Sequence, residues 1–163
     1  RFRAWGKEIA DFAKALGVRT ITLHPNNMNR EDEAQKEALK NLEYFTGLYN
    51  GEIIFCIETF EGKRRVFTPD ETVKFNLPMT LATAHIRNDE KIWSLLKRYK
   101  GNILNIHLSA RKDDKQHLPI DGFCKEVINY LIENKWSGNV ILEYLSEFHD
   151  QMLNDLELLK AMQ

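Results

Sequence analysis

Five short apolar runs in this sequence end on a histidine or a glutamate. The runs are rich in Ile, Val, Leu, Phe and Thr, which is typical of buried β-strands. Imidazole and carboxylate groups can ligate a metal ion or transfer a proton, and the carboxyl ends of parallel strands meet at one edge of a sheet. The sequence therefore predicts a cluster of such groups at the ends of the runs Thr20–His24, Ile53–Glu58, Met79–His85, Ile103–His107 and Val140–Glu143.

Between these runs, apolar residues recur with the spacing of an amphipathic helix. Trp5, Ile9, Phe12 and Leu16 are spaced i, i+4, i+7 and i+11. A helix start is indicated by Thr68-Pro-Asp-Glu71, with Thr as N-cap, Pro at the first helical position and Glu at the third. Similar apolar stripes lie within residues 34–45, 92–99, 123–131 and 152–159.

The alternation of helices and strands predicts an α/β fold with a parallel sheet and right-handed crossovers. No linker or low-complexity tract divides residues 1–163, so we expect a single domain. Five βα units are fewer than the eight of a TIM-type barrel, which typically has about 250 residues. The expected fold is therefore a parallel (β/α) barrel of the TIM type that lacks about its first three βα units. Unpaired sheet edges would favour a homo-oligomer. The strands are expected at residues 20–25, 52–58, 79–85, 103–109 and 139–144.

Composition and charge exclude several classes of function. A net charge of −1 and a pI near 6.6 argue against an electrostatic nucleic-acid binder. No apolar stretch approaches the length of about 18 residues that a membrane-spanning helix needs. The first residues lack the apolar core of a signal peptide. Cys56 and Cys124 are typical of buried thiols in a reduced protein, so a cytoplasmic location is expected.

The ordered set of strand endings resembles the xylose-isomerase-like barrel superfamily, which contains sugar (phosphate) isomerases and epimerases and endonuclease IV (AP endonuclease family 2). The resemblance covers nearly the whole chain. It is carried by Leu23-His24-Pro25, Ile57-Glu58-Thr59, Leu81-Ala-Thr-Ala-His85, Ile106-His107-Leu-Ser109, His117-Leu-Pro-Ile-Asp-Gly122 and Ile141-Leu-Glu143.

The resemblance implies a divalent metal ion, Mn or Zn, bound by Glu58, His107 and Glu143. In the endonuclease branch the residues that match His24, His85 and His117 bind further metals, whereas in the sugar branch they line the pocket. We expect His85 among the metal ligands. The substrate pocket is expected to contain His24, His117 and Arg111.

The chain departs from the family pattern at two positions. The family has Asp-x-x-His where this sequence has Ala82-Thr-Ala-His85, and an alanine cannot ligate a metal. The endonuclease branch has Asp-x-His where Lys115-Gln-His117 places a cation. Both departures weigh against a trinuclear zinc site.

These residues favour proton transfer next to a carbonyl group. Glu58 and Glu143 would exchange the carbon-bound proton of a sugar or sugar phosphate, as in an isomerase or epimerase. Two alternatives remain open: an endonuclease IV-like metal-dependent phosphodiesterase, and a degenerate barrel that binds a ligand without catalysis. For Glu58 and Glu143, an ion pair across the barrel mouth is the simpler interpretation. A carbohydrate partner is expected, and neither nucleic acid nor a membrane is.

Overall fold

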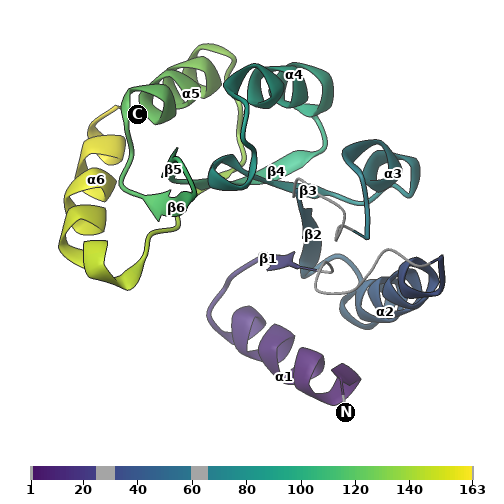
Figure 1. Ribbon diagram of the computed structural model, residues 1–163. Helices are drawn as coiled ribbons and strands as arrows, with labels where there is room; N and C mark the ends of the chain where they lie inside the picture. Colours follow the sequence, from purple (N-terminus) through teal and green to yellow (C-terminus); the bar gives the residue numbers. More distant parts are fainter. Residues whose placement is uncertain (1, 25–31, 60–65, 163) are drawn as a thin grey trace. The chain divides into compact units, whose positions relative to one another are not determined.

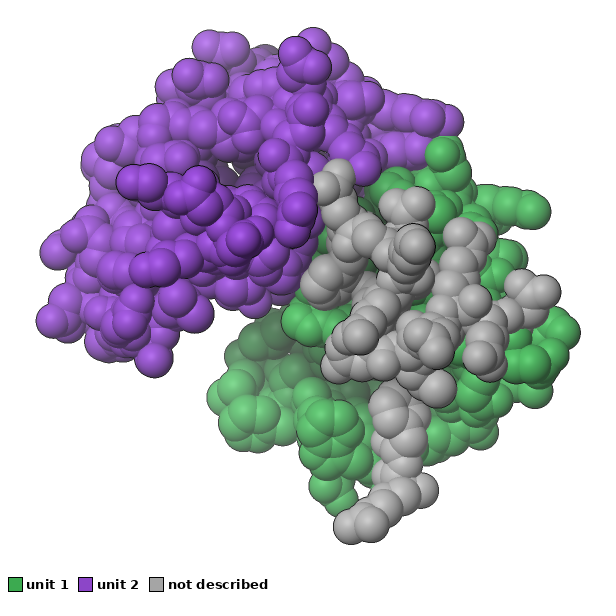
Figure 2. Space-filling view, in the orientation of Figure 1, with its two compact units in different colours: residues 1–79 green, residues 80–163 purple. Residues whose placement is uncertain are grey.

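The computed structural model describes residues 2–24, 32–59 and 66–162. The chain divides into two compact units, residues 1–79 and 80–163, which are coloured separately in Figure 2. Helices and strands alternate along both units, as the sequence predicts. In the described ranges, no helix combines the length and the apolar character needed to cross a membrane.

The first unit contains a parallel pair of strands with helices packed against it (Figure 1). The register runs from Thr20 opposite Ile54 to Leu23 opposite Ile57, so the two predicted strands end side by side. The elements are α1 (Phe2–Ala15), β1 (Thr20–Leu23), α2 (Asp32–Tyr49), β2 (Ile54–Glu58) and α3 (Pro69–Lys74).

Helix α3 begins at the predicted capping box. The Glu71 backbone N–H donates to Thr68 Oγ1 at 3.1 Å, and the Thr68 backbone N–H donates to Glu71 Oε2 at 2.8 Å. These two bonds satisfy backbone donors that a helix start otherwise leaves unpaired, and Pro69 has no such donor to satisfy.

Helix α1 forms where predicted, but its large apolar side chains do not face the core. Trp5 and Phe12 are 61% and 66% exposed, whereas Ala10 is fully buried. The small residues face α2, where a Cβ atom added to Gly6 would lie 2.5 Å from Phe45 Cζ. Close approach of the two helices therefore selects the small side chains for the interface and leaves the large ones outside.

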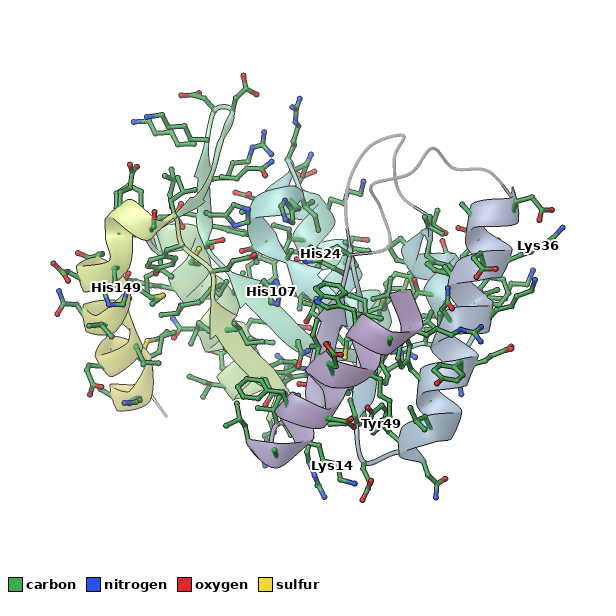
Figure 3. The ribbon with its side chains drawn as sticks, turned by 90° about the horizontal axis from the view of Figure 1, so that it is seen from below. Lys14, His24, Lys36, Tyr49, His107 and His149 are labelled. Atoms are coloured by element: carbon green, nitrogen blue, oxygen red, sulfur yellow. The ribbon has the colours of Figure 1, made fainter. Side chains whose placement is uncertain are left out.

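Polar contacts hold α1 against α2 at a second point. The Tyr49 hydroxyl on α2 lies 2.8 Å from Asp11 Oδ1 and 3.0 Å from the Lys7 carbonyl on α1. Burial, followed by the bond to Asp11, raises the pKa of Tyr49 to about 12. Figure 3 labels Tyr49 and also Lys14 of α1, whose ammonium contacts Glu52 just after α2. The Tyr49 contact contributes more to stability than the Lys14 pair, because that pair is exposed to solvent.

The second unit carries the other parallel pair, β4 with β7, in register from Asn105 opposite Asn139 to Leu108 opposite Leu142. In Figure 1, α5 lies between α4 and α6 along the outside of this unit. The elements are β3 (Met79–Ala82, which starts at the last residue of the first unit), η1 (Thr83–His85), α4 (Asp89–Tyr99), β4 (Ile103–Leu108), β5 (Ala110–Lys112), β6 (Lys115–Leu118), α5 (Gly122–Glu133), β7 (Asn139–Leu142), η2 (Ser146–Phe148) and α6 (His149–Ala161).

The main sheet has the strand order β1-β2-β3-β4-β7, so its strands follow one another in sequence order. This confirms the predicted α/β class with sequential parallel strands. The β5–β6 hairpin was not predicted: we expected one strand at residues 103–109, whereas β4 ends at Leu108, β5 begins at Ala110 and His117 lies in β6. The hairpin strands are too short and too polar to show an apolar alternation, and their tight turn uses Asp113 at φ 55°.

The buried amide of Asn105 links three strands of the second unit through hydrogen bonds. Asn105 on β4 is 1% exposed. Its amide nitrogen donates to Thr80 Oγ1 on β3 at 3.3 Å, and its oxygen accepts from Asn139 Nδ2 on β7 at 2.9 Å. Buried amides are costly unless bonded, so these contacts favour the observed register over a shifted one.

Trp136 lies in the segment between α5 and β7 and packs closely against Gly138. Its indole N–H donates to the Ile103 carbonyl at 3.1 Å. A Cβ atom at Gly138 would lie 2.1 Å from Trp136 Cζ2 and 2.5 Å from the Leu104 carbonyl oxygen. Position 138 therefore has no room for a side chain.

We predict that Gly138→Ala lowers the free energy of unfolding by about 1–3 kcal/mol, because the backbone carbonyl cannot move away from the new methyl group. Gly101→Ala is the matched control, since no atom lies within 4 Å of a Cβ at that site. Urea unfolding of both variants measures the difference. Equal stability of the two variants would contradict the packing described for Trp136.

Candidate metal centre in residues 80–163

The geometry of the candidate centre starts from the parallel pairing of β4 with β7. His107 lies opposite Ile141, and Glu143 follows the last paired residue of β7. The Glu143 backbone N–H is 3.4 Å from the Leu108 carbonyl, which extends the ladder by one step. As a result His107 Nδ1 lies 3.2 Å from Glu143 Oε2. The structure thus brings together two residues that the sequence nominated from separate strands.

His117 approaches the same carboxylate from the hairpin. Its Nδ1 lies 3.5 Å from Glu143 Oε2 and is buried, and no described group forms a hydrogen bond with it. Its backbone is fixed because the Leu145 N–H donates to the His117 carbonyl at 2.9 Å. The sequence assigned His117 to the substrate pocket. Its position makes it a candidate ligand beside Glu143.

His85 completes the group from η1, which follows β3. Its ring lies 4.9 Å from that of His117, at an interplanar angle of 82°. His85 Nδ1 is 3.1 Å from Gln116 Oε1 on the hairpin. One ligand atom each from His85, His117 and Glu143 lies within 4.8 Å of the others. The three residues therefore form a compact donor set.

A threonine fixes η1 against the end of β4. Thr83 Oγ1 is 2.7 Å from the Ser109 carbonyl and accepts from the Ser109 backbone N–H at 3.1 Å. This contact holds the start of η1 next to β4, and His85 is the last residue of that turn. Ala82, where the resemblance leads us to expect an aspartate, is 1% exposed and supplies no ligand atom.

Arg111, predicted to line a substrate pocket, lies on β5 next to η1. Its Nε donates to the Asp113 carbonyl at 2.9 Å, and its Nη1 is 3.4 Å from the Ala84 carbonyl. Its Nη2 lies 3.9 Å from Asp114 Oδ1. Arg111 therefore ties the hairpin to the turn that carries His85.

The remaining predicted residues, His24 and Glu58, belong to residues 1–79. They form an ion pair with each other; the Glu58 side chain is fully buried and that of His24 is about half exposed. The buried carboxylate of Glu58 therefore has an ion-pair partner within the first unit. His149 is exposed at the start of α6, on a different element from His107 (Figure 3).

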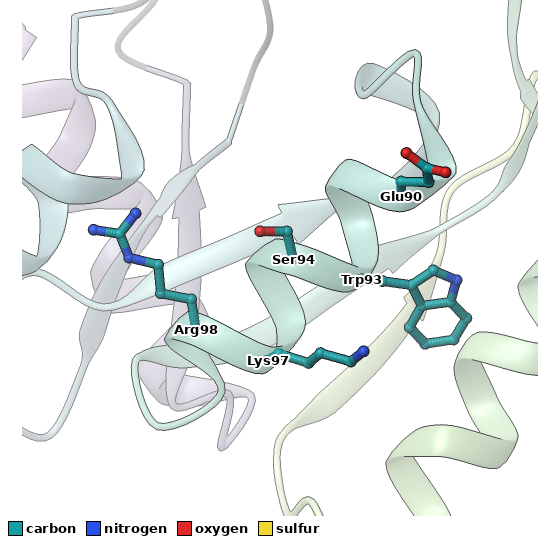
Figure 4. Close-up of a pocket in the computed structure, with 5 residues that line it drawn as sticks. All are labelled: Glu90, Trp93, Ser94, Lys97 and Arg98. Carbon is teal, nitrogen blue, oxygen red and sulfur yellow. The ribbon is translucent and has the colours of Figure 1, made fainter.

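An open hollow on the surface of α4 lies elsewhere. Figure 4 shows the side chains that line it, and none of the predicted site residues is among them. Its lining follows one helix face with both signs of charge, which is typical of a solvated helix surface. The histidine and carboxylate cluster is the stronger candidate site, because its side chains converge from η1, β4, β6 and the residue that follows β7. The lining residues of the hollow are Glu90, Trp93, Ser94, Lys97 and Arg98.

The donor set suits a divalent ion such as zinc. Two ligands at about 2.1 Å from one ion lie no more than about 4.2 Å apart. The ligand atoms of the three residues lie within 4.8 Å of one another. This upper limit exceeds the separation of two ligands on one ion by only about half an ångström. The buried His117 Nδ1, with no described hydrogen-bond partner, is the kind of group that a metal would satisfy. The residues present therefore fit a divalent metal ion.

Sequence reasoning missed the residue that follows Glu143. The Tyr144 hydroxyl donates to Asp155 Oδ2 at 2.7 Å and accepts from the Ile120 N–H at 2.9 Å. Burial, followed by the bond to Asp155, raises the pKa of Tyr144 above its ordinary value. Asp155 is only 6% exposed on α6, and nothing in the local pattern of that helix distinguishes it from a surface aspartate.

No protein-family model and no curated protein matches this sequence. The resemblance to the xylose-isomerase-like superfamily therefore rests on the strand-ending residues alone.

We predict that Tyr144→Phe lowers the free energy of unfolding by about 1–3 kcal/mol at neutral pH, because Asp155 and the Ile120 N–H lose a buried partner. The raised pKa means that the folded state favours the protonated hydroxyl. Its contribution is therefore present below about pH 10 and lost as the pH rises above it.

The wild type should consequently lose stability above about pH 10 more steeply than the Phe variant. Tyr130→Phe is the matched control, because the Tyr130 ring packs against Trp93 and the change keeps that contact. Urea titrations across this pH range provide the measurement. Parallel stability curves for wild type and Tyr144→Phe would contradict the role given to the hydroxyl.

Proposed function

We propose that this chain forms part of a TIM-type barrel that binds a divalent metal ion, Mn or Zn, and isomerises or epimerises a sugar or sugar phosphate. The observation that carries the proposal is the convergence of His85, His117 and Glu143, whose ligand atoms lie within 4.8 Å of one another. His107 Nδ1 lies 3.2 Å from Glu143 Oε2, the oxygen that His117 also approaches. The sequential order of the parallel strands is compatible with this fold class.

In this proposal His85, His117 and Glu143 hold the metal, and His107 lies beside the carboxylate, with its Nδ1 3.2 Å from Glu143 Oε2. When bound, the ion would polarise the carbonyl and hydroxyl oxygens of a sugar as a Lewis acid. A glutamate removes the proton from the carbon next to the carbonyl. In an isomerase the proton then returns to the former carbonyl carbon, while the hydroxyl proton passes from one oxygen to the other. In an epimerase it returns to the opposite face of the same carbon.

Glu58, in the first unit, is also proposed as a proton-transfer group. Its side chain is fully buried and forms an ion pair with His24, so its carboxylate is removed from water and the imidazole offsets part of that cost. A carboxylate in such surroundings is a common feature of general acids and bases. The histidine provides a group to which the proton can pass.

A metal-dependent phosphodiesterase is the second candidate. Two imidazoles with one carboxylate form a donor set that is well known for catalytic zinc, which favours this alternative over the non-catalytic barrel. The net charge of −1 opposes it, because binding to a nucleic-acid backbone draws most of its affinity from positive charge.

Calorimetric titration with Zn²⁺ and Mn²⁺ tests the metal site. We predict that the protein binds one ion and that Glu143→Gln weakens binding by at least about 10-fold, since the carboxylate is a ligand in this arrangement. The matched control is Glu147→Gln, which removes an exposed carboxylate four residues away. Equal weakening by both variants, or no binding by the wild type, would contradict the site.

Deuterium exchange in D₂O, followed by NMR, tests the reaction. With a panel of ketoses, aldoses and their phosphates, the metal-loaded protein should exchange the proton next to the carbonyl, and Glu143→Gln should not. Cleavage of duplex DNA at an abasic site without any sugar exchange would favour the phosphodiesterase. Metal binding with neither activity would favour a barrel that binds a ligand only.

A further inference from the structure

Gln116 makes a specific contact with a candidate metal ligand. Its Oε1 lies 3.1 Å from His85 Nδ1, and both side chains are partly buried. Gln116 is next to His117 on β6, so one short strand contributes both a candidate ligand and a residue that touches another candidate ligand. The sequence pattern gave Gln116 no role.

The chemistry of the contact decides where the His85 proton sits. An amide oxygen can only accept a hydrogen bond, so the ring nitrogen facing it must carry the hydrogen. In a neutral imidazole, a proton on Nδ1 leaves the lone pair on Nε2. Metal-binding histidines commonly have their second nitrogen held in this way, and the partner fixes both tautomer and ring orientation.

We propose that Gln116 is a positioning residue that holds His85 as the Nδ1–H tautomer and so presents Nε2 as the ligand atom. This inference rests on the metal site proposed above. His117 provides the contrast: its buried Nδ1 is the nitrogen that lies near Glu143. The two histidines therefore offer opposite ring nitrogens to the centre.

The hairpin has other attachments to the segment that carries His85, so Gln116 can be replaced without detaching it. Arg111 contacts the Ala84 carbonyl at 3.4 Å, and Arg87 lies 3.7 Å from Asp114. Gln116→Leu removes the acceptor at similar size. Gln116→Glu restores an acceptor, and Lys115→Leu makes the same kind of change at the exposed neighbouring position.

Long-range proton–nitrogen NMR spectra of metal-free protein, labelled with ¹⁵N-histidine and held at a pH where the rings are neutral, report each tautomer. His85→Gln assigns the His85 signals, and exposed His149 serves as an internal reference. The wild type, Gln116→Glu and Lys115→Leu should show His85 protonated on Nδ1. Gln116→Leu should show a mixture of tautomers.

Zinc titration of the same proteins completes the test. Gln116→Leu should weaken zinc binding by about 10–100-fold, and Gln116→Glu should recover most of the loss. A wild-type His85 protonated on Nε2, or an unchanged tautomer in Gln116→Leu, would overturn the inference. If the tautomers behave as expected but the wild type binds no zinc, the lock on His85 stands and the metal site itself is overturned.

Discussion

The parallel pairing of β4 with β7 is the constraint on which the candidate centre depends. Parallel strands end on the same side, so pairing His107 with Ile141 brings Glu143 next to the His107 ring. A slip of one residue would turn every side chain of β7 to the other face and separate the pair. The hydrogen bond between Asn139 and the buried amide of Asn105 opposes such a slip, because the Asn105 amide would lose this partner. A purely structural bond thus maintains the geometry of the chemical groups.

The second half of the centre comes from elements of a different kind. His85 leaves the sheet through a short 3-10 turn, and His117 comes from an antiparallel hairpin. Both elements are held by backbone carbonyls: those of His107 and Ser109 contact Thr83, and that of Ala84 contacts Arg111. Main-chain groups are present whatever the side chains, so this support tolerates variation in the surrounding sequence.

The sequence predicted the features that depend on periodicity and on local bonding. Apolar runs located all five main strands, and the Thr68 capping box located the start of α3. For the candidate centre, the strand-end rule nominated His85, His107 and Glu143. These residues lie near one another because parallel strands end on the same side of a sheet, so position along a strand indicates position in space.

The features that the sequence missed depend on contacts between distant residues. The β5–β6 hairpin is too short to show a period, so the sequence pattern did not indicate a strand at Gln116 and His117. Tyr144 and Asp155 are 11 positions apart and are joined only by the path of the chain between β7 and α6. The outward face of α1 was also misjudged, because apolar spacing shows that a helix has a face but not which face the fold covers.

The packing of α1 inverts the usual relation between side-chain size and tolerance to substitution. In most helices the largest apolar residues are the least replaceable, because removing them leaves cavities. Here Trp5 and Phe12 occupy no cavity, whereas Gly6 and Ala10 define how closely α1 approaches α2. Substitutions should therefore be tolerated at the exposed Trp5 and Phe12. They should be restricted at Gly6, where an added methyl group would collide with the Phe45 ring on α2.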